Sequence, residues 1–365
     1  MNVMKLTILS VAYPLTEVGI DAVGGSEQIL TLLDRNLVSE GHRSLVIAAE
    51  GSKVEGTLIA SPPAAGRLDD SVRDWGRRIH RKLIKDALAK YPIDLIHMHS
   101  LDFHAYVPPG SVPVLATLHL PPDWYPRKIF HQRSSRYQLN CVSKSQHRSC
   151  PPSSHLLPPI PNGVDVDRLG TDVQRRNFAL ALGRICPEKG FHFALDAARR
   201  AKTELVLAGQ VFPYRAHLDY FRRTIRPRLD AMRRFIGPVG FSEKRRLLSQ
   251  AKCLMIPSTV SETSSLVAME AFACGTPVIA FRSGALPEII DHGRTGFLVS
   301  DVAEMSRALR DVGDLNPETC RRVARTRYSA QTMASRYLQV YQNLVRDNSG
   351  ERSADRYVNQ WAVSP

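Results

Sequence analysis

The chain has no apolar run approaching the roughly 20 residues of a membrane-spanning helix, so a transmembrane protein is not expected. Aromatic residues make up only 7% of the chain, and its 6 cysteines are scattered without paired metal-ligand spacing. Several of these cysteines lie in apolar segments, so we interpret them as reduced core residues of a cytoplasmic protein. No cluster of His, Cys and carboxylate residues stands out, and the sequence therefore predicts no metal site.

Acidic residues are too few to balance the basic ones: 35 Asp and Glu face 49 Lys and Arg, which gives a formal net charge of +14. Much of this charge lies between Arg67 and Lys90, where apolar positions at helical spacing oppose basic ones. The apolar positions are Val72, Trp75, Ile79, Leu83 and Ala87, and the basic positions are Arg73, Arg77, Arg78, Arg81, Lys82 and Lys85. We interpret this segment as an amphipathic helix whose basic face is exposed to solvent. A secondary hypothesis is that the basic face attaches the protein to the inner face of an anionic membrane. No nucleic-acid motif accompanies the charge, so no nucleic-acid partner is expected.

A length of 365 residues is too great for one ordinary core and favours two domains. The first half alternates short apolar runs with helical patterns, which predicts a parallel α/β sheet with right-handed crossovers. Strands are predicted at residues 6–12, 44–48, 93–99, 112–119 and 139–143, and Gly24 and Gly25 open a helix that ends by Gly41. A weak signal peptide is an alternative for the first segment, but a glycine-rich loop follows it without a cleavage-like region.

A proline-rich passage marks a change in composition, and we place a linker at about residues 160–175. The predicted N-terminal domain covers residues 1–165 and the C-terminal domain 172–327, with a last helix at 328–345 packing back toward the first domain. In the second half, strands are predicted at 178–182, 204–208, 253–258, 278–281 and 295–299, and helices at 191–201, 220–234, 242–251 and 266–274. The tail beyond Arg346 is expected to be frayed.

Two glutamates, Glu262 and Glu270, carry the strongest functional information. Glu262 lies in a loop after a predicted strand, and Glu270 lies inside the helix that follows, in an otherwise apolar segment. Ligands of open α/β sheets bind at the carboxyl ends of strands, and free N–H groups at a helix start suit an anion. An acid in apolar surroundings usually has a partner or ligand. Taken singly, each is equally consistent with a solvated acid.

Two cations, Arg184 and Lys189, lie in the first strand-to-helix turn of the second half. A bidentate guanidinium and a mobile ammonium, together with backbone N–H groups, would suit a diphosphate. A solvated loop is an equally good interpretation of these two residues alone. Neither a nucleotide P-loop nor a Gly-x-Gly-x-x-Gly turn occurs in the chain.

Taken together, the order and spacing of these segments resemble the family-4 retaining glycosyltransferases, whose GT-B fold has two Rossmann-like domains facing an interdomain cleft. The resemblance covers nearly the whole chain. The matching segments are Gly24 and Gly25, residues 94–99, 117–119, 142–143, 161–165 and 183–190, the pair Glu262 and Glu270, and residues 284–290 and 293–299.

The resemblance implies a role for each matched residue. Arg184 and Lys189 would hold the diphosphate of a nucleotide-sugar donor, and Glu270 would bind the ribose hydroxyls. Glu262 would contact the transferred sugar, and His119 would reach one of its hydroxyls near the reaction centre. The remaining donor contacts implied are Gly24, Gly25, Gly237, Pro238, Val239, Ser265, Leu266 and Val267.

The implied function is transfer of a sugar, with retention, from a nucleotide-sugar (UDP-sugar favoured) to an unidentified carbohydrate, lipid-linked or small-molecule acceptor. Such a step would serve polysaccharide, glycolipid or secondary-metabolite biosynthesis and would need no cofactor or metal. Residues 165–167 resemble a metal-binding DxD motif, but they lie in the linker, and the two cations already supply the charge. The family's Gly-Phe-Gly is replaced by residues 263–265, Thr-Ser-Ser, which leaves the donor sugar open. A sugar phosphorylase, a nucleotide-sugar epimerase and a non-catalytic glycan- or nucleotide-binding protein remain alternatives.

Overall fold

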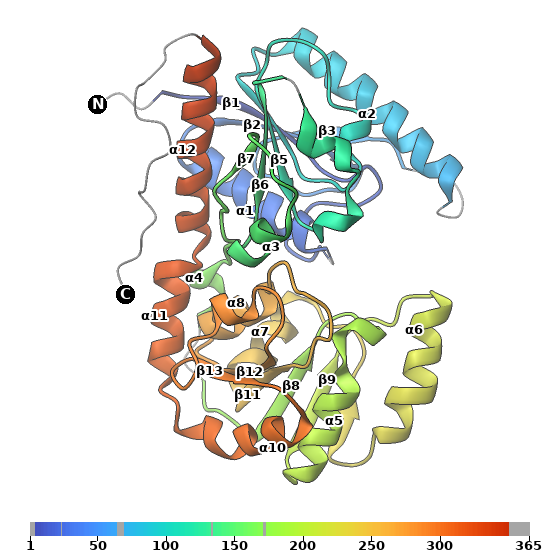
Figure 1. Cartoon of the computed structure of the whole chain (residues 1–365), viewed down its shortest axis with the longest axis vertical. Helices are drawn as coiled ribbons and strands as arrows, with labels where there is room; N and C mark the ends of the chain where they lie inside the picture. Colours follow the sequence, from blue (N-terminus) through green and yellow to red (C-terminus); the bar gives the residue numbers. More distant parts are fainter. Residues whose placement is uncertain (1–3, 23, 64–68, 133, 171–172, 350–365) are drawn as a thin grey trace.

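The computed structural model describes residues 4–22, 24–63, 69–132, 134–170 and 173–349. Two parallel sheets, each covered by helices on both faces, lie one above the other, and the long helix α12 (Ala330–Ser349) runs beside the first (Figure 1). The predicted α/β fold with two Rossmann-like halves is confirmed. The predicted frayed tail falls largely on residues 350–365, which lie outside the described residues.

The first sheet has seven strands in the order β3-β2-β1-β4-β5-β6-β7. Its strands are β1 (Thr7–Val11), β2 (Arg43–Ala49), β3 (Thr57–Ser61), β4 (Leu95–Met98), β5 (Val114–Leu118), β6 (Tyr137–Cys141) and β7 (Leu156–Leu157). The accompanying helices are α1 (Gly25–Ser39), α2 (Asp70–Lys90) and α3 (Lys144–Ser149). β4 and β5 are buried along their whole length, because a parallel sheet carries helices on both faces. The N-terminal segment is therefore a central strand, β1, paired with β2 and β4.

The second sheet has six strands in the order β10-β9-β8-β11-β12-β13. Its strands are β8 (Phe178–Leu182), β9 (Glu204–Ala208), β10 (Arg233–Phe235), β11 (Cys253–Ile256), β12 (Val278–Phe281) and β13 (Gly296–Val299). Its helices are α5 (Phe191–Arg200), α6 (Arg215–Tyr220), α7 (Phe241–Gln250), α8 (Leu266–Ala273), α9 (Leu286–Ile289), α10 (Val302–Asp311) and α11 (Pro317–Arg327). A short helix, α4 (Val166–Leu169), lies between the two sheets in sequence.

The predicted long basic helix over residues 220–234 is only partly right, because helical structure ends at Arg228 and a strand follows. α6 ends at Tyr220 and passes into a π-helical turn, Phe221–Ile225, and a 3₁₀ turn, Arg226–Arg228. Pro227 has no N–H to continue the helical ladder. The chain then forms β10, which pairs with β9 and gains sheet hydrogen bonds that a helix would have lost.

Helix α12 returns from the second half of the chain to the first domain. Its apolar side chains share a core cluster with strands β1, β4 and β5 and with helix α1. Tyr337 and Tyr341 are fully buried there and reach a polar network inside the first sheet. The first domain therefore includes the C-terminal helix in its core.

The predicted basic helix forms α2, although Arg67 lies outside the described residues. The centre of its buried face is Gly76, His80 and Ile84, beside the predicted apolar stripe. Glycine at position 76 lets α2 approach Pro14, since a Cβ there would lie 3.0 Å from the proline Cβ.

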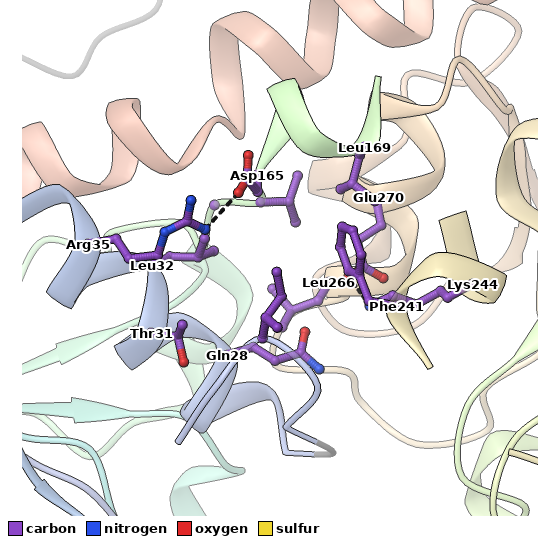
Figure 2. Close-up of a pocket in the computed structure, with 13 residues that line it drawn as sticks. Gln28, Thr31, Leu32, Arg35, Asp165, Leu169, Phe241, Lys244, Leu266 and Glu270 are labelled. Carbon is purple, nitrogen blue, oxygen red and sulfur yellow. Dashed lines mark hydrogen bonds and ion pairs between the residues drawn. The ribbon is translucent and has the colours of Figure 1, made fainter. Parts of the chain in front are cut away.

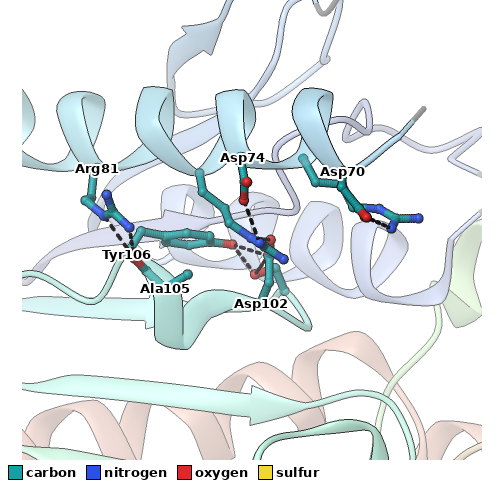
Figure 3. Close-up of polar contacts among 9 residues, drawn as sticks. Asp70, Asp74, Arg81, Asp102, Ala105 and Tyr106 are labelled. Atoms are coloured by element: carbon teal, nitrogen blue, oxygen red, sulfur yellow. Dashed lines mark hydrogen bonds and ion pairs between the residues drawn. The ribbon is translucent and has the colours of Figure 1, made fainter. Parts of the chain in front are cut away.

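Two arginines on the basic face of α2 form hydrogen bonds to the loop after β4 (Figure 3). Arg77 donates to Asp102 at 2.9 Å and to Asp74 at 2.9 Å, and Arg81 donates to the Ala105 carbonyl. Asp102 also accepts from the Tyr106 hydroxyl at 3.0 Å. These contacts give two arginines of the face a structural partner. None of the described helices is long and apolar enough to cross a membrane.

Candidate active site

The two sheets place four loops at their topological switch points. In the first sheet the strand order reverses between β1 and β4, and in the second between β8 and β11. Ligands of open α/β sheets bind outside the carboxyl ends of strands at these points. The loops that leave the four strands there contain Gly24 and Gly25, His99, Lys189, and Glu262.

Lys189 and Glu262, which are 73 residues apart in sequence, form an ion pair. The Lys189 Nζ lies 2.6 Å from the Glu262 Oε1, and the two side chains are 27% and 10% exposed. Lys189 ends the 3₁₀ turn Pro187–Lys189 after β8, and Glu262 follows β11. Because β8 and β11 are neighbours, the two loops meet at one edge of the sheet. The predicted donor-site cation and carboxylate are thus in contact.

Glycines fix the shape of these two loops. Gly190, directly after Lys189, has φ +62°, and a Cβ there would lie 2.2 Å from the Pro257 carbonyl oxygen. Gly284 has φ +53° and packs so closely on Glu262 that an added Cβ would lie 2.2 Å from the Glu262 carbonyl oxygen. Both positions need glycine because of the positive φ and the close backbone approach. The two glycines thereby fix the backbone beside Lys189 and Glu262, whose side chains form the ion pair.

Glu270 forms a second ion pair, which the sequence did not predict. Lys244 of α7 places its Nζ 2.5 Å from the Glu270 Oε1, and both side chains are largely buried. The two residues border a small pocket between α1, α7, α8 and the linker (Figure 2). Arg35 of α1 and Asp165 of the linker form an ion pair at 2.9 Å on another side of this pocket. Nothing in the sequence spacing connects Lys244 with Glu270, which are neighbours only because α7 packs on α8.

The start of α8 faces the start of α1 across the interdomain cleft. A Cβ added to Gly25 would lie 3.3 Å from the Leu266 Cδ1, so the two helix N-termini lie side by side. Ser265 is the N-cap of α8, and its side chain makes no capping hydrogen bond. The first N–H groups of α8 have no intrahelical partner, so this helix end is positive. The Glu27 carboxylate already lies at the start of α1, so the α8 side of the cleft is the one suited to an anion.

Three histidines cluster in the first domain behind the same region, and of the three only His119 is partly exposed. The His99 Nδ1 lies 3.2 Å from the His119 Nε2, and the His97 ring lies 3.9 Å from the His99 ring. Burial lowers the pKa of His119 to about 4, so its imidazole is neutral near pH 7. The Thr263 hydroxyl donates to the His119 carbonyl oxygen at 2.9 Å and links the glutamate loop to the first domain. His119 therefore lies at the cleft, and its Nε2 already has His99 as a partner.

The remaining predicted residues lie around this centre. Arg184 is exposed, in the turn after β8. Gly237, with φ +79°, accepts a backbone hydrogen bond from Gly209 at 2.8 Å, and Pro238 and Val239 follow it toward α7. Ser264 carries a buried hydroxyl oxygen without a hydrogen-bond partner among the described residues.

Glu288 joins the domains on the far side of the cleft, and the sequence assigned it no contact. Its carboxylate accepts from the backbone N–H groups of Lys144, at 2.9 Å, and Ser145, at the start of α3. Arg148 of the same helix lies 3.7 Å from the carboxylate. An acid at a helix N-terminus is favourable, and here the acid belongs to the other domain.

Three residues that could hold a metal ion come together in the structure, although the sequence showed no such cluster. Cys186, Glu188 and His217 have ligand atoms that all lie within 4.8 Å of one another. The three residues come from the turn after β8 and from α6, so the sequence separation of His217 concealed the cluster. Asp165, the first residue of the DxD-like triplet, is ion-paired with Arg35 and caps α4, so its carboxylate already has partners within the protein.

The fold and the site define a GT-B protein, with two Rossmann-like domains and a cleft between them. Residues 23–168 match the family described as Glycosyltransferase Family 4, and residues 176–314 match Glycosyl transferases group 1. The two matches together cover most of the chain, which therefore belongs to the family-4 GT-B glycosyltransferases.

The chain also resembles individual proteins. It is 32% identical over 200 residues to a glycogen synthase of Mycobacterium tuberculosis, an alignment that covers 50% of this chain and 47% of that one. It thus spans about half the length of that curated relative. AviGT4, a glycosyltransferase of avilamycin A biosynthesis, has the same fold with a TM-score of 0.71 and 22% identity, over 93% of this chain and 98% of its own. HepE of Anabaena, solved with UDP-glucose, gives a TM-score of 0.70 and 17% identity, over 92% and 99%.

Proposed function

We propose that this protein transfers a sugar from a nucleotide-sugar, with a UDP-sugar favoured, to an acceptor hydroxyl, with retention at the anomeric carbon and without a metal at the reaction centre. The observation that carries the proposal is the Lys189–Glu262 pair beside the α8 N-terminus, facing the N-terminus of α1. Family membership and the UDP-glucose complex of HepE support the donor class.

The donor diphosphate fits against Lys189, Arg184 and the first N–H groups of α8. As the C1–O bond to the leaving group breaks, negative charge develops on the β-phosphate. Cations and helix-start N–H groups stabilise that charge more in the transition state than in the ground state, and each such donor is worth roughly 3 kcal/mol. Before binding, the Lys189 ammonium is paired with Glu262. Donor binding exchanges this partner for phosphate and leaves the Glu262 carboxylate to accept from sugar hydroxyls.

On the nucleoside side, Glu270 accepts from the ribose hydroxyls, and the ion pair with Lys244 orients its carboxylate. On the other side of the cleft, neutral His119 hydrogen-bonds a sugar hydroxyl. The acceptor hydroxyl attacks C1 from the face that the leaving group departs, and its proton passes to a β-phosphate oxygen. The first domain holds the acceptor, which is a carbohydrate, a lipid-linked sugar or a small molecule.

A thermal-shift panel of UDP-, GDP- and ADP-sugars tests the proposal, with NAD as a ligand control and no metal added. We expect one nucleotide-sugar to raise the melting temperature, and Lys189→Ala to remove that shift while the protein stays folded. Lys85→Ala, which removes an exposed lysine of α2, is the matched control and should keep the shift.

Turnover gives the second measurement once the donor is known. Lys189→Ala should lower kcat about 100-fold or more, as the loss of one transition-state donor does. A folded wild-type protein that responds to no nucleotide-sugar, or a Lys189→Ala variant with unchanged turnover, would contradict the proposed function.

A further inference from the structure

The cluster of Cys186, Glu188 and His217 lies beside the proposed donor site and has no part in the sugar transfer. Cys186 and Glu188 flank Pro187 in the 3₁₀ turn that ends at Lys189, and His217 projects from α6. A thiol, a carboxylate and an imidazole converge with ligand atoms within 4.8 Å of one another. We propose that this cluster is a zinc-binding site, with the fourth coordination position open to water.

The kinds of donor atom select the metal. Zn²⁺ is bound tetrahedrally by cysteine sulfur, histidine nitrogen and carboxylate oxygen, at distances of roughly 2.0 to 2.3 Å. Donor atoms arranged around such an ion lie roughly 3 to 4 Å apart. The ligand atoms of Cys186, Glu188 and His217 all lie within 4.8 Å of one another, which is compatible with that separation. A soft sulfur ligand disfavours Mg²⁺ and Ca²⁺, which prefer oxygen.

An unsatisfied ring nitrogen is a second, independent indication of a ligand. The His217 Nδ1 is buried and has no hydrogen-bond partner among the described residues. A buried polar atom without a partner costs free energy, and a bound metal ion would remove that cost. The aromatic rings of Tyr214 and Phe212 pack on His217 at centroid distances of 5.2 and 6.3 Å and restrict its orientation.

The turn itself is held in place by other contacts. Thr259 donates from its backbone N–H, at 2.9 Å, and from its hydroxyl, at 3.2 Å, to the Glu188 carbonyl oxygen, and the Ser258 hydroxyl donates to the same oxygen at 3.2 Å. Cys186 is 2% exposed, whereas Glu188 is exposed, so the ion would enter from the Glu188 side. Burial, and next the nearby Glu188, raise the pKa of the Cys186 thiol.

Zinc binding to the fully reduced protein can be measured by competition with a chromophoric chelator, with Mg²⁺ as the comparison ion. We expect one tightly bound Zn²⁺ per chain, and no displacement by Mg²⁺. Cys186→Ser and His217→Ala should each weaken zinc binding at least about tenfold, since even loss of an outer partner of a metal ligand costs that much. His217 is only partly buried, so its variant keeps the test valid if Cys186→Ser fails to fold.

Cys150→Ser is the matched control, because Cys150 and Cys141 have sulfur atoms 3.4 Å apart and are the rival thiol site. Zinc affinity should be unchanged in this variant. Co²⁺ should give a thiolate-to-metal absorption band in the wild type and in Cys150→Ser, but not in Cys186→Ser. Binding that survives both Cys186→Ser and His217→Ala, binding lost in Cys150→Ser, or no tight zinc at all would overturn the proposal. Neither readout depends on sugar transfer, so this test stands apart from that of the proposed function.

Discussion

Replacement of Tyr341 by Phe tests how the C-terminal helix is anchored in the first domain. The protons of the buried network have only one consistent arrangement. The Thr117 hydroxyl donates to the Asn140 Oδ1 at 2.7 Å, so it must accept from the His97 Nε2, also at 2.7 Å. Burial lowers the pKa of His97 well below its usual value, so the ring is neutral and its Nδ1 carries no proton. The Tyr341 hydroxyl, at 2.6 Å, must therefore donate to that nitrogen.

The direction of the Tyr341–His97 hydrogen bond determines how much stability Tyr341→Phe should cost. Tyr341→Phe removes one hydroxyl and leaves the ring, so the apolar packing of α12 is preserved. The His97 Nδ1 then remains buried without a donor, which costs about 1 to 3 kcal/mol. We expect a loss of about 2 kcal/mol, which is roughly a 30-fold change in an equilibrium constant. The same substitution at Tyr214, which is 54% exposed, should change stability by less than about 0.5 kcal/mol.

Native-state hydrogen exchange of the α12 amides is the suitable assay, because two domains need not unfold in one transition. Amides in the middle of α12 should exchange about 30-fold faster in Tyr341→Phe than in the wild type, while those of α10 stay unchanged. A Tyr341→Phe variant indistinguishable from Tyr214→Phe would refute the proton assignment, and with it the role of the network in docking α12.

Two further predictions concern the donor site and pH. Glu270→Gln should weaken nucleotide-sugar binding in calorimetry about tenfold, because a charge-assisted acceptor and its pairing with Lys244 are lost; unchanged affinity would rule out the ribose contact. Burial lowers the pKa of His80 to about 4, below its unfolded value of 6.5, so its stability contribution is present above pH 6.5 and is lost as the pH falls toward 4. From pH 7 to pH 5 this residue alone should cost about 2 kcal/mol of unfolding free energy. His80→Leu should show a correspondingly smaller loss in urea titrations at the two pH values, and an identical loss would contradict the assignment.

Local patterns predicted the elements that lie in the sheet centres. The apolar runs at residues 6–12 and 112–119 correspond to β1 and β5, since a strand buried on both faces must be apolar along its length. The same signal is weak at the edge of a sheet. The first two residues of β10, Arg233 and Arg234, were predicted as helix and Phe235 as extended, because nothing in exposed and half-exposed residues distinguishes the start of an edge strand from a helix end.

The sequence by itself placed Lys189 and Glu262 in loops that follow strands and showed that glycines mark the turns beside them. Only the tertiary structure decided which charges are partners. Lys244 meets Glu270 because α7 packs on α8, and Glu288 meets α3 because the domains face each other. The tertiary structure also places His217 of α6 close to Cys186. Contacts of this kind depend on how separate elements pack, so they cannot be predicted from the spacing of residues within one element.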